Sequence, residues 1–337
     1  MVKIDYRKLI GFSNGSYVVT MPKAWVQQHK LKKGDLIGIE EGTNELVFHA
    51  DSKEIEKEEK TVSINIDNKK LNFIKAEIIT AYLDNNHTIE IFSSTLEDDA
   101  PLIKGILRNL SGMEIIEQTS KRIVAKDLID VSSISIQNII RRMDIITRSM
   151  MEDNILCMQG KCNPKSIVHR DVDVNRLYYL GCRVIKNAME NPILMKKLKT
   201  TPWKLLVDKT ILRRIEEIAD SQKRVCKLIA HAEFMDKFLQ EFKQLNEDIK
   251  ERYCNVMKAY YTNDKKLAYD IEVTSKIINE KCDKFLEHAG KAACTNCQLK
   301  FSEQLINLSK KEKIDSKKLS MDTSKTIVSV ANMAEYT

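Results

Sequence analysis

The sequence predicts a multidomain, mainly α-helical protein with a small β-rich module at its N-terminus. Three observations predict this fold class. The chain has 337 residues, 43% of them apolar, which is enough for two or three separate hydrophobic cores. Residues 1–50 alternate apolar and polar side chains over short runs, as half-buried strands do. From Val131 onward, apolar residues instead recur at spacings of three and four, which is the helical period.

Residues 1–50 are expected to form four short strands and one short helix. Pro22 falls in the first turn of that helix, where proline is favoured, and the helix continues to residue 28. A core of this size is below the roughly 60 residues that usually fold alone, so we expect the module to dimerise. The strands are predicted over 2–9, 16–21, 36–40 and 45–49.

The rest of the chain is predicted to contain a small α/β domain followed only by helices. Residues 51–60 are highly charged and indicate a linker, whereas residues 61–130 alternate strands with helices. The helical part divides into two consecutive three-helix units, 131–230 and 231–337, of which the second is degenerate and ends in a helix over 324–335. In the α/β domain, strands are predicted over 61–66 and 87–92, one or two strands over 114–125, and helices over 69–83 and 97–110.

Basic charge is concentrated at the N-terminus. The whole chain has a formal net charge of +7, and residues 1–33 alone contain seven Lys or Arg residues against the single acid Asp5. Clustered cations favour polyanions, because neutralising phosphates releases counterions. DNA is therefore one expected partner of this part of the chain, and an ordinary lysine-rich surface is the other interpretation.

Two segments of the N-terminal module resemble a known family. Gly15-Ser-Tyr-Val-Val-Thr-Met-Pro-Lys-Ala-Trp25 is followed by Leu31-Lys-Lys-Gly-Asp-Leu36. This order of strand, proline-initiated helix and Gly-Asp turn resembles the AbrB/SpoVT/MazE swapped-hairpin family. The resemblance implies a homodimeric swapped-hairpin β-barrel over 1–50, with a basic face that lies along double-stranded DNA. The DNA-binding residues that it implies are Lys3, Arg7, Lys8, Lys23, Lys32 and Lys33.

Individual residues of these segments have a physical role in the expected fold. Gly34 supplies a turn conformation that is costly for other residues, and Asp35 can accept backbone hydrogen bonds there. The bacterial members of the family have one arginine pair before the hairpin and another after the proline. This sequence has neither pair, and Val26 and Gln27 stand where the second pair would fall. We therefore expect contact with the phosphate backbone more than base-specific reading.

The helical part resembles the PhoU family, regulators of phosphate uptake and phosphate signalling that contain two tandem three-helix bundles. Arg214-Ile-Glu-Glu-Ile-Ala-Asp220 is similar to that family's arginine-x-glutamate-x-x-small-aspartate motif, and Asp171-Val-Asp-Val-Asn175 is similar to the partner motif on the preceding helix. Because the family's carboxylates bind metal ions, the resemblance implies a divalent or trivalent metal ion at Asp173, Glu216 and Asp220. Ordinary pairing of Asp220 with Arg224, four residues later, is the alternative explanation.

The rest of the sequence gives no indication of a zinc site, a catalytic site or a membrane span. The single Cys294-Thr-Asn-Cys297 pair has no second pair at finger-like spacing, so we do not expect zinc there, and the eight cysteines are expected to be reduced thiols. No phosphate-cradling glycine loop or nucleophile motif is present, so an enzyme is not expected. No apolar run reaches the roughly 18 residues of a membrane span, and we expect a soluble, cytoplasmic protein without membrane insertion.

These observations together predict a phosphate-responsive transcription regulator. Its expected partners are a second copy of itself, double-stranded DNA, and a phosphate ABC transporter ATPase or sensor kinase. One alternative is a PhoU-like adaptor for such an ATPase or sensor, in which the N-terminal module only dimerises. Another alternative is a metal-binding sensor protein, which depends on the carboxylates at Asp173, Glu216 and Asp220.

Overall fold

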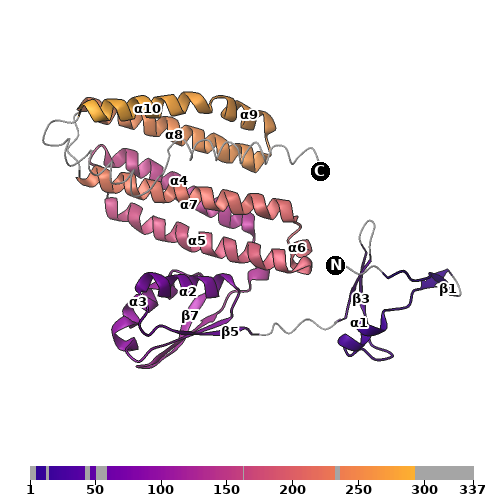
Figure 1. The fold of residues 1–337 in the computed structure, drawn as a ribbon. Helices are drawn as coiled ribbons and strands as arrows, with labels where there is room; N and C mark the ends of the chain where they lie inside the picture. The colour runs from indigo at the N-terminus through magenta and orange to yellow at the C-terminus, as the bar shows by residue number, and fades with distance from the viewer. Residues whose placement is uncertain are drawn as a thin grey trace. The chain divides into compact units, whose positions relative to one another are not determined.

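The computed structural model divides the chain into two compact units, Met1–Glu59 and Lys60–Thr337 (Figure 1). Most of the structure is helical, with small sheets, and the residues that it describes contain no closed barrel. None of the helices among these residues is both long and apolar enough to cross a membrane. The structure describes residues 5–12, 15–41, 46–50, 59–161, 163–231 and 236–292.

The N-terminal unit contains two antiparallel β-hairpins separated by a short helix. Strand β1 (Ile10–Phe12) pairs with β2 (Ser16–Val18), and β3 (Gly38–Glu41) pairs with β4 (Leu46–His49). Helix α1 (Lys23–Gln28) lies between the hairpins in the chain. The strand predicted over 2–9 is wrong in its described part, because residues 5–9 have no strand partner within one copy and the first strand begins only at Ile10.

Gly34 and Asp35 have their predicted roles in the turn after α1, whereas Pro22 lies just outside the helix. Pro22 precedes α1 as its N-terminal cap rather than standing in its first turn. Gly34 adopts a φ of 98°, a left-handed conformation that favours glycine. The Asp35 side chain accepts a hydrogen bond from the backbone N–H of Lys32 at 2.6 Å, which closes the turn into β3.

The described residues of one copy of the N-terminal unit form no hydrophobic core. No side chain described between residues 5 and 50 is buried. Tyr6 is 88% exposed and Leu36 is 75% exposed, although both would normally be covered in a folded domain. Other large apolar side chains of the unit share this exposure; they are Leu9, Ile10, Phe12, Tyr17, Val18, Val19, Ile39, Leu46 and Val47.

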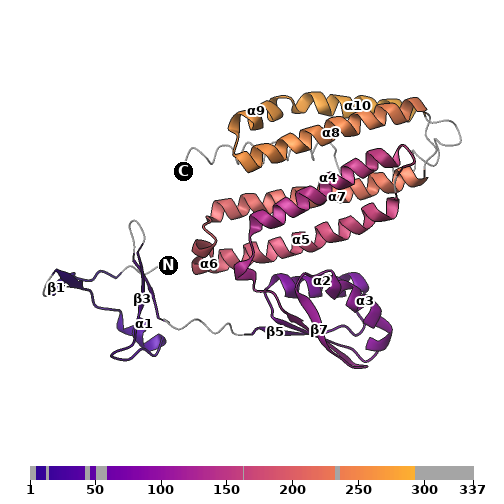
Figure 2. The ribbon, with the colours of Figure 1, turned by 180° about the vertical axis from the view of Figure 1, so that it is seen from behind.

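The second unit begins with an α/β domain. Its four-stranded sheet has the order β5-β6-β8-β7, in which β5 and β6 are parallel and the other neighbours are antiparallel. Helices α2 and α3 cover one face of the sheet (Figures 1 and 2). Isoleucines of the helices and strands, including Ile78, Ile89 and Ile103, form the core between them. The elements are β5 (Thr61–Asn65), α2 (Leu71–Leu83), β6 (Thr88–Phe92), α3 (Leu96–Arg108), β7 (Met113–Gln118) and β8 (Arg122–Asp127).

Three long helices form a bundle after the short 3-10 helix Val131–Ser133. They are α4 (Ile136–Cys157), α5 (Pro164–Glu190) and α7 (Pro202–His231), with the short helix α6 (Pro192–Lys197) before α7. Asn163 caps α5 by accepting from the Lys165 N–H at 3.0 Å. Gly181 lets α5 approach α7, since a Cβ there would lie 2.6 Å from Leu212 Cδ1.

Helices α8 (Asp236–Thr262), α9 (Lys265–Val273) and α10 (Ser275–Ala292) form a further layer against the first bundle (Figures 1 and 2). Tyr253, Met257 and Tyr260 of α8 belong to the core of the first bundle. Tyr260 Oη donates to Asp208 Oδ1 at 2.7 Å, and both side chains are buried. The predicted last helix, over 324–335, lies outside the described residues, as do Cys294 and Cys297.

The cysteines differ in their redox state. Cys182, Cys226, Cys254 and Cys282 are free, as expected. Cys157, at the end of α4, is disulfide-bonded, so the expectation of reduced thiols is wrong at this position. Reduced thiols were expected because the cysteines are spread through helical sequence in a long, intracellular-looking chain, whereas Cys157 lies at a helix end where the chain turns back.

Candidate functional site

The predicted DNA-binding residues that the structure describes are all exposed. Two precede β1, one opens α1, and two lie in the turn that follows it. Arg7 forms an ion pair with the carboxylate of Asp5. The exposed residues are Arg7, Lys8, Lys23, Lys32 and Lys33, while Lys3 lies outside the described residues.

A cluster of polar side chains lies between α5 and α7 of the first bundle. Asp171 and Asn175 are four residues apart on α5. Glu216, Asp220 and Lys223 follow one another at spacings of four and three on α7. These spacings place each set on one helix face, and we call the five residues the α5–α7 cluster.

Lys223 lies between two carboxylates that come from different helices. Its Nζ is 2.8 Å from Asp171 Oδ2 and 2.6 Å from Asp220 Oδ1. The other oxygen of Asp220, Oδ2, accepts a hydrogen bond from Arg224 Nε at 3.1 Å. Asn175 Nδ2 donates to Asp171 Oδ2 at 3.2 Å. The Asp171 side chain is only 7% exposed and that of Lys223 is 21% exposed, so the ammonium group links the two helices in a partly buried position.

The ionisable side chains of the cluster differ in the direction in which their pKa values are shifted. Burial, followed by the negative charges of Asp220 and Asp171, raises the pKa of Glu216 to about 7. Burial also acts to raise the pKa of Asp220, but hydrogen bonds from Lys223 and Arg224 outweigh it and keep this pKa below its ordinary value. Burial opposes the charge on Lys223, yet its two carboxylate partners raise the pKa of the ammonium. Glu216 is therefore the carboxyl group whose charge changes near neutral pH.

The structure brings together part of the predicted metal-ligand set. Glu216 and Asp220 share a face of α7, as predicted, but Asp173 is exposed on α5. Asp171, which the sequence analysis did not select, is the α5 carboxylate that meets α7. Two positions along a helix rotate a side chain by about 200°, so Asp171 and Asp173 lie on nearly opposite sides. The spacing of four between Asp171 and Asn175 was the signal that could have found the inward face.

The α5–α7 cluster does not fit a metal ion in its present arrangement. Within the described part of the chain, no three His, Cys, Asp or Glu side chains are grouped so that they could hold a metal. A hard cation needs several oxygen atoms that converge on one point. Between Asp171 and Asp220 that point is taken by the ammonium of Lys223, which has no lone pair to offer.

A second buried cluster joins the first bundle to the α/β domain. Arg183 of α5 is fully buried and donates from Nη2 to Asp127 Oδ2 of β8 at 2.6 Å. Its Nε donates to Asn85 Oδ1 at 3.1 Å, and its guanidinium lies 4.6 Å from the centre of the Tyr82 ring. Tyr179 of the same helix packs against the core of the α/β domain. These contacts make α5 a helix that both cores share.

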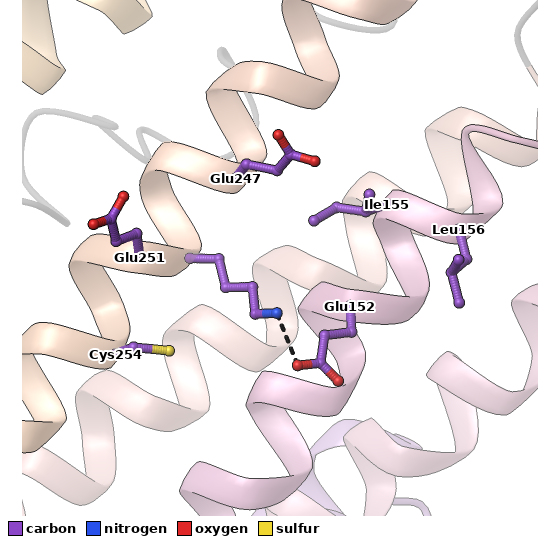
Figure 3. Close-up of a pocket in the computed structure, with 7 residues that line it drawn as sticks. Glu152, Ile155, Leu156, Glu247, Glu251 and Cys254 are labelled. Carbon is purple, nitrogen blue, oxygen red and sulfur yellow. Dashed lines mark hydrogen bonds and ion pairs between the residues drawn. The ribbon is translucent and has the colours of Figure 1, made fainter.

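A pocket of about 480 Å³ lies between α4 and α8 (Figure 3). Lys250 of α8 forms an ion pair with Glu152 of α4, and their Nζ and Oε1 atoms are 2.8 Å apart. None of the predicted site residues lines this pocket. The full lining consists of Glu152, Ile155, Leu156, Glu247, Lys250, Glu251 and Cys254.

Comparisons with known proteins add no assignment. No protein-family model matches the chain, and no curated protein or solved structure matches it either.

Proposed function

We propose that this protein is a phosphate-responsive regulator that binds double-stranded DNA through a dimer of its N-terminal module and controls phosphate uptake. The observation that carries the proposal is the exposure of apolar and basic side chains in the N-terminal unit. A second copy would cover the apolar residues and complete a swapped-hairpin barrel, which the single chain lacks. The basic residues would then be doubled on one dimer and could contact DNA phosphates.

The helical part is proposed to receive the signal. A phosphate transporter ATPase or a sensor kinase is the expected binding partner, in keeping with the resemblance to PhoU proteins. The buried contacts of Arg183 with Asp127 and Asn85 support transmission, because a shift of α5 must also move the α/β domain. The proposed activity is binding rather than catalysis, in the cytoplasm where DNA is accessible.

DNA binding can be tested by the salt dependence of affinity for a labelled duplex. We expect a steep loss of affinity with rising salt. A triple substitution Arg7→Ala, Lys8→Ala and Lys23→Ala should lower the slope of log K against log salt by about 5.4, because the dimer loses six phosphate contacts and each contributes about 0.9. The matched control removes three exposed lysines from the helices and should leave the slope unchanged. These control residues are Lys227, Lys266 and Lys276.

The adaptor alternative predicts the opposite result. If the full chain shows no duplex binding even at low salt, the N-terminal module only dimerises and the DNA proposal fails. Dimerisation itself is tested by sedimentation of the full chain. Phe12→Glu, at a position that is 67% exposed in one copy, should shift the wild-type dimer to monomer, while Lys30→Glu in the same unit should not.

A further inference from the structure

Lys223 occupies the position in which two facing carboxylates require a cation. We infer that Lys223 is the resident cation of the α5–α7 cluster, so that the first bundle closes without a metal ion and loss of the lysine side chain converts the cluster into a divalent-cation site. This inference does not depend on the proposed DNA-binding function. It concerns residues of one bundle, and its readouts are metal binding and thermal stability.

The charge balance of the cluster supports the first part of the inference. Asp171 and Asp220 bring two negative charges from different helices to one place, and Asp171 is almost completely buried. Two carboxylates that lie close enough to contact the same ammonium group repel each other unless a positive charge lies between them. Lys223 Nζ is within 2.8 Å of an oxygen of each, and Arg224 neutralises the remaining oxygen of Asp220. The bundle therefore carries its own counter-charge.

Geometry makes the ammonium and a metal ion mutually exclusive. A divalent cation would use the same two oxygen atoms, Asp171 Oδ2 and Asp220 Oδ1, at about 2.0–2.6 Å. An ammonium group 2.6 to 2.8 Å from those oxygens leaves no position where a second cation could bind without strong repulsion. The lysine must leave before a metal can enter.

The donor set that remains after removal of the lysine is suited to a hard cation. Asp171 and Asp220 offer the oxygens that Lys223 now contacts, and Glu216 lies one helical turn before Asp220 on the same face. Mg²⁺ and Mn²⁺ keep several water ligands, so two carboxylates suffice to hold such an ion. The two carboxylates of Asp171 and Asp220 supply only oxygen ligands, as hard cations require.

The experiment compares Lys223→Ala with Lys227→Ala, an exposed lysine on the next turn of α7, in the full chain. Mn²⁺ binding is followed by electron paramagnetic resonance, and Tm is measured in EDTA and in Mn²⁺. We expect the wild type and Lys227→Ala to bind no Mn²⁺ at the cluster and to have the same Tm in both buffers. Lys223→Ala should lose about 5 °C in EDTA and recover most of it at about 100 times the Kd for Mn²⁺.

Two further variants separate the inference from general damage to the bundle. Lys223→Arg keeps the positive charge and should remain insensitive to Mn²⁺. Adding Asp220→Asn to Lys223→Ala should abolish the gained Mn²⁺ response, because one carboxylate ligand is lost. If Lys223→Ala folds only after Mn²⁺ is added, the inference is supported.

Three results would overturn the inference. The first is Mn²⁺ binding by the wild type that Asp220→Asn removes, since the metal would then displace the lysine. The second is a Tm of Lys223→Ala in EDTA equal to that of the wild type. The third is a Lys223→Ala protein that gains no Mn²⁺ response, including one that does not fold in either buffer.

Discussion

Arg183 provides the most demanding test of how the bundle and the α/β domain are joined. Its substitution by methionine keeps most of the side-chain volume and removes the charge. Asp127, whose side chain is 2% exposed, would then be a buried carboxylate that has lost its cation. Asn85 Oδ1 would lose its donor as well. We expect a large loss of stability in the second unit and no change in the N-terminal unit.

The magnitude follows from the burial of the pair. Removing one partner of a buried ion pair costs about 3–5 kcal/mol, because the other charge stays desolvated. The lower end applies here, since Arg183 Nη1 has no hydrogen-bond partner in the described structure and its desolvation already weakens the pair. About 3 kcal/mol corresponds to a fall in Tm of roughly 6–12 °C for a unit of this size.

The assay is urea unfolding of the full chain, followed by circular dichroism, for Arg183→Met, Asp127→Asn and the double variant. The double variant should be more stable than Arg183→Met, because no unpaired charge remains buried. Lys186→Met is the control, since Lys186 is a partly exposed cation on the same helix that pairs with Asp84. The reasoning would be refuted if Arg183→Met lowered the free energy of unfolding by less than about 1 kcal/mol, or if the double variant were no more stable than Arg183→Met.

Other predictions address single contacts. Gly181→Val should lower the free energy of unfolding in urea by about 2 kcal/mol, because the new side chain collides with Leu212. Gly105→Val, at a position with open space around it, should leave the free energy of unfolding almost unchanged. Equal losses in the two variants would contradict the close approach of α5 and α7. Tyr260→Phe should cost about 1 kcal/mol through the lost bond to Asp208, with the exposed Tyr6→Phe as control. Since the folded chain holds the Glu216 proton more tightly, with a pKa of about 7 against 4.5, wild-type stability should fall as the pH rises through that range. Glu216→Gln should remove this part of the pH dependence, and an unchanged pH profile would argue against it.

Local signals in the sequence predicted most of the elements in the α/β domain and first bundle. The Asn163-Pro164 pair marks the start of α5, because asparagine caps and proline fits the first turn. The segment 114–125 divides into β7 and β8 at a turn in which Thr119 Oγ1 accepts from the Arg122 N–H at 3.0 Å. The strand expected over 2–9 was wrong because a strand depends on its partner, and a single chain supplies none for residues 5–9.

The contacts of the candidate site were harder to predict, since they depend on how helices rotate against one another. Helix spacing grouped Glu216 with Asp220, but nothing in the sequence indicated that Lys223 would reach across to Asp171. Arg183 was missed because an arginine in a helix is normally exposed. Its position three residues after the buried Leu180 was the available signal that it lies on an inward face.

The exposed apolar side chains of the N-terminal unit have a consequence for dosage. If two copies must meet before this module has a core, the amount of dimer rises with the square of protein concentration at low expression. A modest change in synthesis or degradation would then produce a disproportionate change in the amount of dimer. Tyr6 and Leu36, which are the most exposed of these side chains, would be hidden from solvent and proteases only above that concentration threshold.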